Sequence, residues 1–202
     1  MFQFDLLTTE LNKMSSIRRS LFAVMTAERL TPFFRHHAGA NLAAVEVVNK
    51  ALNFVWRGIS HPAPSSNENT QGVEQINFVQ RVIPDEDDPA HFSAQADDAA
   101  AALIYAIRSL SSQDPRDAAW AAQRAYDSVD NFINRLPDST GFIPSTYVDN
   151  HPLLDEELSV QKADLEYAWQ ANLEDLPSAR RRSVQAGEVF FSRLIKTMDG
   201  DG

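Results

Sequence analysis

Residues 15–32 read SSIRRSLFAVMTAERLTP, and this stretch decides the fold. Its apolar side chains recur at steps of three and four residues, which places them on one face of an α-helix. The face consists of Ile17, Leu21, Val24 and Met25. The Ser15-Ser16 pair is suited to cap the start of this helix, and Pro32 is expected to end or kink it.

The same spacing of apolar residues continues along most of the chain. It predicts further helices over residues 4–13, 41–59, 73–83, 93–110, 114–136, 153–176 and 184–198. Residues 61–72 and 138–152 have the composition of long loops, and residues 199–202 that of a frayed tail. No segment alternates like a strand, and no repeat has a fixed period. We therefore predict an all-α fold, a single domain over residues 1–202 that forms a bundle of about eight helices with two long loops.

The composition excludes several classes of protein. The chain has 28 acidic and 18 basic residues, a formal net charge of −10, which argues against nucleic-acid binding because phosphates require a basic surface. It has no cysteine, which excludes disulfides and thiolate chemistry. The first residues do not resemble a signal peptide, and no window approaches the roughly 18 apolar residues of a membrane span. We expect a soluble cytoplasmic protein that binds neither nucleic acid nor membranes.

Acidic residues are concentrated in two segments. The first segment contains Asp85, Glu86, Asp87 and Asp88, and the second contains Asp155, Glu156 and Asp164. One interpretation is that these are solvated helix faces and loop residues that keep the protein soluble. The alternative is a docking surface for a basic protein partner.

Glu28 interrupts the apolar face of the helix predicted after Ser15. A helical wheel places it between apolar neighbours, so we expect its carboxylate to be buried. Burial of an ionised acid requires a cation, here Arg18, Arg29 or an arginine from another helix. The carboxylate either forms a structural ion pair or lines a pocket with a raised pKa.

Motifs for metal, nucleotide or covalent chemistry are missing from the sequence. None of the five histidines follows a glutamate by three residues, and no His-Glu-x-x-His, glycine-rich phosphate loop or Gly-x-Ser-x-Gly occurs. We therefore predict no catalytic residue, metal site or cofactor. The basic run of residues 180–182 is interpreted as a solvated face, and the three tryptophans as core residues with indole N–H partners.

Three stretches resemble the YjaG-like family of bacterial proteins, domain of unknown function 416. They are AERLTP at residues 27–32, ADDAAAAL at residues 96–103, and NHP at residues 150–152 followed by Glu157. The positions that match the family are Glu28, Arg29, Asp98, Ala99 and Pro152; where the family usually has a cysteine beside its helical core, this chain has alanine. The resemblance implies an all-α fold, a bacterial cytoplasmic setting and no established activity.

The helical wheel and the resemblance coincide at Glu28 and Arg29, and Asp98 lies early in the alanine-rich helix, where the helix dipole favours an acid. We hypothesise that these three residues form one partly buried polar cluster. The leading function hypothesis is an acidic protein-interaction module, of inhibitor, immunity or regulatory type, that binds a basic partner. The alternative is a small-molecule-binding protein or hydrolytic enzyme built on the cluster, which a deep pocket at these residues would favour. A homodimer formed through an apolar helix face is a third possibility.

Overall fold

The computed structural model describes residues 2–61, 66–84, 90, 92–136 and 151–198. In these residues the chain forms eight α-helices and one short 3-10 helix, and it has no strand. The helices are α1 (Phe4–Asn12), α2 (Ser16–Ala38), α3 (Leu42–Ser60), α4 (Ser66–Gln80), α5 (Ser93–Ser111), α6 (Arg116–Ile133), α8 (Pro152–Gln170) and α9 (Leu176–Met198), with η1 (Leu173–Asp175) before α9. The predicted all-α fold is confirmed.

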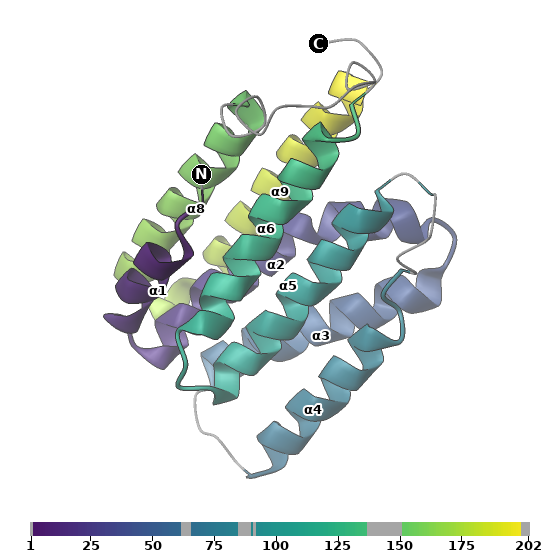
Figure 1. Ribbon diagram of the computed structural model, residues 1–202. Helices are drawn as coiled ribbons and strands as arrows, with labels where there is room; N and C mark the ends of the chain where they lie inside the picture. Colours follow the sequence, from purple (N-terminus) through teal and green to yellow (C-terminus); the bar gives the residue numbers. More distant parts are fainter. Residues whose placement is uncertain (1, 62–65, 85–89, 91, 137–150, 199–202) are drawn as a thin grey trace.

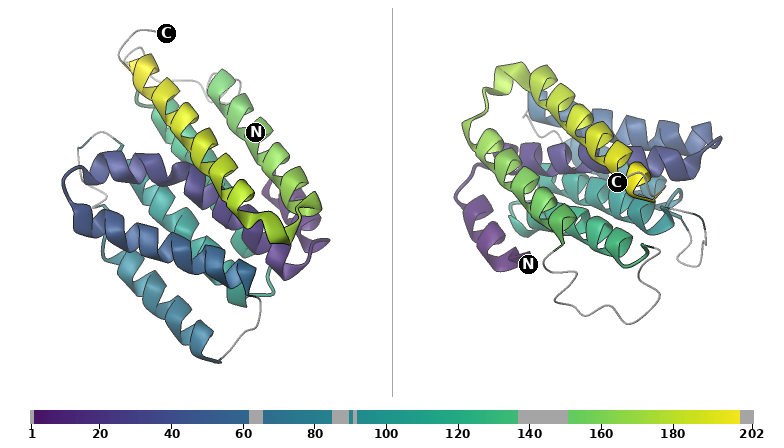
Figure 2. Two further views of the ribbon diagram at one scale, coloured as in Figure 1. Left: turned by 180° about the vertical axis from the view of Figure 1, so that it is seen from behind. Right: turned by 90° about the horizontal axis from the view of Figure 1, so that it is seen from above.

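Helix α2 is the centre of the bundle. Every residue from 19 to 34 is buried, so this helix is enclosed on all sides rather than along one stripe. Figure 1 shows α8 and α9 on one side of α2, and α3 and α4 on the other; the two views of Figure 2 agree. Helices α5 and α6 pack against each other and against α2. Residues of α2 therefore contact most of the other helices directly.

Pro32 was expected to end or to kink its helix. It does not end the helix, because α2 continues to Ala38. A proline inside a helix costs about 3 kcal/mol, since it removes one hydrogen bond and its ring crowds the preceding turn. Leu30, Phe33 and Phe34 around it are all buried. We infer that the packing of these large side chains outweighs the cost.

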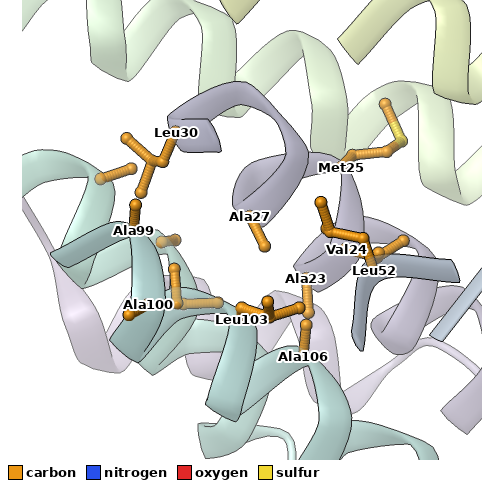
Figure 3. Packing of buried hydrophobic residues seen from close by; sticks show 14 of the residues in the cluster. Ala23, Val24, Met25, Ala27, Leu30, Leu52, Ala99, Ala100, Leu103 and Ala106 are labelled. Atoms are coloured by element: carbon orange, nitrogen blue, oxygen red, sulfur yellow. The ribbon is translucent and has the colours of Figure 1, made fainter. Parts of the chain in front are cut away.

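Small side chains bring α2 and α5 together. Figure 3 shows Ala23 and Ala27 of α2 pointing toward α5, where Ala106 lies against Ala23. These alanines are at most 2 % exposed, and α2 packs more extensively against α5 than against any other described element. Alanine at a helix contact allows the two backbones to approach closely.

One predicted loop boundary fails for reasons of packing. The predicted loop at 61–72 is wrong from residue 66 onward, because α4 begins at Ser66. Gly72 lies close to Ile107 and Phe54, so this part of α4 rests on α5 and α3, and tertiary contact overrides the polar composition. Residues 62–65, residues 138–150 of the second predicted loop and the tail at 199–202 lie outside the described residues. That loop was predicted to continue to residue 152, but Pro152 already belongs to α8.

The predicted helices over 153–176 and 184–198 are wrong at the boundary between them, because α8 ends at Gln170 and α9 already begins at Leu176. Asn41 caps α3, accepting a hydrogen bond of 3.2 Å from the backbone N–H of Ala44. Across the described ranges, no helix combines the length and apolar character needed to cross a bilayer.

Candidate functional site

Glu28 lies among apolar residues on α2, as its position on the wheel predicts, and it is 2 % exposed. Its Oε2 accepts a hydrogen bond of 2.7 Å from Nε1 of Trp56 on α3 and one of 3.1 Å from Nε of Arg180 on α9. The cation that accompanies the carboxylate is therefore an arginine from another helix. With one cation and one N–H donor, the buried charge costs far less than an unpaired one.

Arg29, the next residue, forms a second set of contacts with α8. Its Nη1 and Nη2 donate to the two carboxylate oxygens of Glu157 at 2.8 and 3.1 Å, and its Nε donates to Asp164 at 2.9 Å. Asp164 also pairs with Arg182 of α9 at 3.1 Å. Burial opposes the charge of Arg29, but the Glu157 and Asp164 carboxylates raise its pKa. Burial raises the pKa of Asp164, against the opposing charges of Arg29 and Arg182. We call these four residues the Arg29 network.

Asp98 has a third and looser set of contacts, between α5 and α6. Its two carboxylate oxygens accept hydrogen bonds of 3.3 Å from Nη1 of Arg124 and from Nδ2 of Asn131. Burial raises the pKa of Asp98 to about 7, against the charge of Arg124, and Asp127 adds to the rise. Asp98 is thus a buried acid that its partners compensate only in part.

Glu28, Arg29 and Asp98 therefore do not form the single polar cluster that the sequence predicts. All three side chains are buried, but in the described residues no hydrogen bond or ion pair joins one of them to another. Adjacent residues of a helix point about 100° apart, so Glu28 and Arg29 reach different neighbours. Asp98 is directed to α6 instead of α2.

Asp98 makes stability depend on pH in a specific direction. Its pKa is raised from 3.8 in the unfolded chain to about 7, so the folded protein binds this proton more tightly. The resulting stabilisation is fully present below about pH 4 and is lost as the pH rises through 7. We expect Asp98→Asn to raise the free energy of unfolding by about 2 kcal/mol at pH 8 and to have little effect near pH 4. Urea unfolding of both proteins at the two pH values measures this difference.

The matched control is Asp155→Asn, which removes the same charge at an exposed position of α8. Titrating groups common to all three proteins cancel in the comparison. An equal effect of Asp98→Asn on the free energy of unfolding at pH 4 and pH 8 would contradict the raised pKa of Asp98.

A groove of about 740 Å³ lies beside Glu28's partners, between α3, α4 and the start of α9. We call it the α3–α9 groove. Its cationic lining residues are Lys50, Arg57 and Arg180, and its apolar ones are Trp56, Leu176 and Pro177. The volume is within the range of about 300–1,000 Å³ that is typical of ligand sites.

Glu28 lies in the interior next to this groove and holds residues of one wall in position. It holds Trp56 and Arg180 directly, and Nη1 of Arg180 donates a hydrogen bond of 2.6 Å to Oδ1 of Asn53, which also lines the groove. The Arg180 guanidinium lies 5.9 Å from the centre of the Trp56 ring. A buried carboxylate thus fixes the positions of three groove residues.

Lys50, Asn53, Arg57 and Ser60 follow one another at steps of three and four residues in α3. The sequence displays this polar face, but a polar face at helical spacing is typical of a solvated helix surface, so the sequence alone does not identify it as part of a groove. The basic run was interpreted as solvated, and this is wrong for two of its members: Arg180 pairs with Glu28, and Arg182 pairs with Asp164.

The predicted acidic surface is only partly exposed. Asp164 is 1 % exposed and belongs to the Arg29 network, so its assignment to a solvated face is wrong. Glu156 pairs with Arg193 of α9, and Asp155 is exposed. Residues 85–88, the other acidic segment, lie outside the described residues.

The tryptophans divide between core and surface. Trp56 is 6 % exposed and its indole N–H has a partner, as predicted. Trp120 and Trp169 are 40 % and 47 % exposed, so their assignment to the core is wrong. Among the described residues, no group of three or more His, Asp or Glu side chains is arranged to hold a metal ion.

These observations define an all-α protein in which a buried central helix carries charged residues to contacts with its neighbours. The chain belongs to the family described as "Protein of unknown function (DUF416)", whose model matches residues 7–188. This confirms the resemblance found in the sequence.

A crystal structure of a DUF416 family protein from Shewanella baltica OS155 is similar to this chain, with a TM-score of 0.72 and 18 % sequence identity. The similarity covers 92 % of this chain and 94 % of the other. At this identity it supports the fold and carries no activity. No curated protein is significantly similar to the chain.

Proposed function

We propose that this protein is a binding protein that takes a small organic ligand in the α3–α9 groove. The observation that carries the proposal is the contact of buried Glu28 with Trp56 and Arg180, both of which line the groove. The buried Glu28 carboxylate holds the groove residues Trp56 and Arg180 in position before a ligand binds. Such preorganisation lowers the entropy cost of binding.

The lining side chains favour binding over hydrolysis. They offer guanidinium, ammonium, amide and indole groups, which orient a ligand through hydrogen bonds and packing. General acid–base chemistry is most often performed by histidine, aspartate or glutamate. Glu28 is already engaged by two donors and is enclosed by α2, α3 and α9, so its role in this proposal is structural.

An acidic docking surface for a basic protein is the second candidate. The formal net charge of −10 and the exposed Asp155 favour it, since opposite charges accelerate association. Two of its acids are not available for a partner, because Asp164 is buried and Glu156 already pairs with Arg193.

Crystals soaked with small aromatic fragments test the groove proposal directly. A set of matched naphthalene fragments carrying an anionic, neutral or cationic group is suitable. We expect at least one fragment to occupy the space between Trp56, Leu176 and Pro177, because these residues supply the apolar surface of the groove. Fragments found only elsewhere on the protein, or none at all, would contradict the proposal.

A further inference from the structure

We infer that the α3–α9 groove selects organic carboxylates with an apolar body, and that Arg57 is the residue that recognises the carboxylate. This inference rests on the proposed function and names the chemistry of its ligand.

The charges of the groove are balanced with one exception. Arg180 pairs with Glu28 at 3.1 Å, and Lys50 pairs with Glu46 at 2.6 Å. Arg57 has no carboxylate partner in the described part of the chain; its Nε donates to the backbone oxygen of Asn53 at 3.3 Å. One uncompensated cation matches a monoanion better than a doubly charged phosphate.

Donors for a carboxylate remain on both arginines. A guanidinium has five N–H groups in a planar fork. Arg180 uses two of them, for Glu28 and Asn53, and Arg57 uses one. Arg57 therefore keeps the edge formed by Nη1 and Nη2, the geometry that binds a carboxylate through both oxygens, and Arg180 keeps three N–H groups on Nη1 and Nη2. Arg180 is held in place by Glu28, whereas Arg57 is exposed and able to follow the ligand.

Apolar surface lies next to these donors. Trp56, Leu176 and Pro177 line the same groove, and its volume of about 740 Å³ exceeds what a carboxylate alone would fill. A bare inorganic anion would leave this surface exposed to water. A carboxylic acid with a hydrocarbon or aromatic body covers it and gains the free energy of apolar burial.

Calorimetric titration with two near-isosteric probes tests the inference. Naphthalene-1-acetate carries the carboxylate, and naphthalene-1-acetamide has the same body without the charge. We expect the wild-type protein to bind the acetate about tenfold or more tightly, because charge-assisted hydrogen bonds are roughly twice as strong as neutral ones. Arg57→Gln should reduce this preference to less than about threefold.

The control variant is Arg181→Gln. It removes a neighbouring cation that is exposed, donates to Ser178 and does not line the groove. Its preference for the acetate should equal that of the wild type, which excludes a general effect of net charge.

The outcomes separate the inference from the proposed function. Equal affinity of the wild type for acetate and acetamide, with the acetamide bound in the groove, would overturn the inference and leave the binding proposal standing. A preference that survives Arg57→Gln would overturn the role of Arg57. Binding of neither probe in the groove would overturn both.

Discussion

Replacing Arg29 by alanine is expected to lower the free energy of unfolding by about 3–5 kcal/mol. The variant loses three hydrogen bonds to carboxylates and leaves Glu157 buried without its cation. Asp164 keeps Arg182, but that side chain is 36 % exposed and cannot replace the enclosed guanidinium. Urea denaturation at pH 7, followed by circular dichroism, measures the loss.

Two further variants show whether the loss comes from the geometry of the Arg29 network. Arg29→Lys keeps the charge but not the planar fork, so we expect a loss between those of the wild type and Arg29→Ala. Arg193→Ala breaks a salt bridge with Glu156 at the surface, where the side chains are 50 % and 30 % exposed, and should cost less than about 1 kcal/mol. Similar losses for Arg29→Ala and Arg193→Ala would contradict the special position of Arg29.

Helix α8 shows why sequence periodicity did not identify this network. Leu153 is buried at its start, and from there on its buried face consists of Leu154, Glu157, Gln161, Asp164 and Ala168. These positions follow one another at steps of three and four residues, so the helical spacing is regular. Three of the five side chains are polar, however, and a pattern search based on hydrophobicity assigns such a face to solvent. The face turns inward because Arg29 of α2 supplies its partner, more than a hundred residues away in the chain.

Helix α3 shows the opposite case, in which local signals suffice. Val48, Leu52, Val55 and Ile59 are all at most 4 % exposed, as their spacing predicts. The cap at Asn41 depends on residues within one turn. Both features are determined by neighbours in the sequence.

The candidate site could be predicted in part. The burial of Glu28 follows from its position among apolar residues, and so does its need for an arginine. The choice of Arg180 does not, because Arg180 and Arg182 are two residues apart in α9 and point in different directions, one to Glu28 and one to Asp164. That choice depends on how α9 is rotated against α2, which only the complete packing determines.

Gly187→Ala is expected to lower the free energy of unfolding by about 3 kcal/mol, although alanine is the better helix former by about 1 kcal/mol. Helix α9 crosses α2 (Figure 2), and a Cβ atom at Gly187 would be 2.4 Å from the backbone oxygen of Arg29 and 2.9 Å from its Cα. Backbone atoms of a buried helix cannot rotate away as a side chain can. The two helices would therefore have to separate, and the loss is measured by urea denaturation.

Two other glycines provide matched controls for this substitution. In Gly58→Ala the new Cβ meets the methyl groups of Leu110 at 2.9 and 3.1 Å, and these can move, so the change should be within about 1 kcal/mol. In Gly72→Ala the nearest atom is 3.7 Å away, and we expect a gain of up to about 1 kcal/mol from helix propensity. A Gly187→Ala variant as stable as Gly58→Ala would show that α9 does not rest on the backbone of α2.

The contact at Gly187 and the Arg29 network are expected to be coupled, because separation of α9 from α2 also moves Arg182 away from Asp164. The double variant Gly187→Ala with Arg29→Ala should therefore lose less stability than the sum of the two single losses, by about 1 kcal/mol or more. Gly58→Ala combined with Arg29→Ala is the control, and its losses should add because Gly58 contacts Leu110 instead of the network. Additive losses in both cycles would mean that the close approach of the helices and the buried charges stabilise the bundle independently.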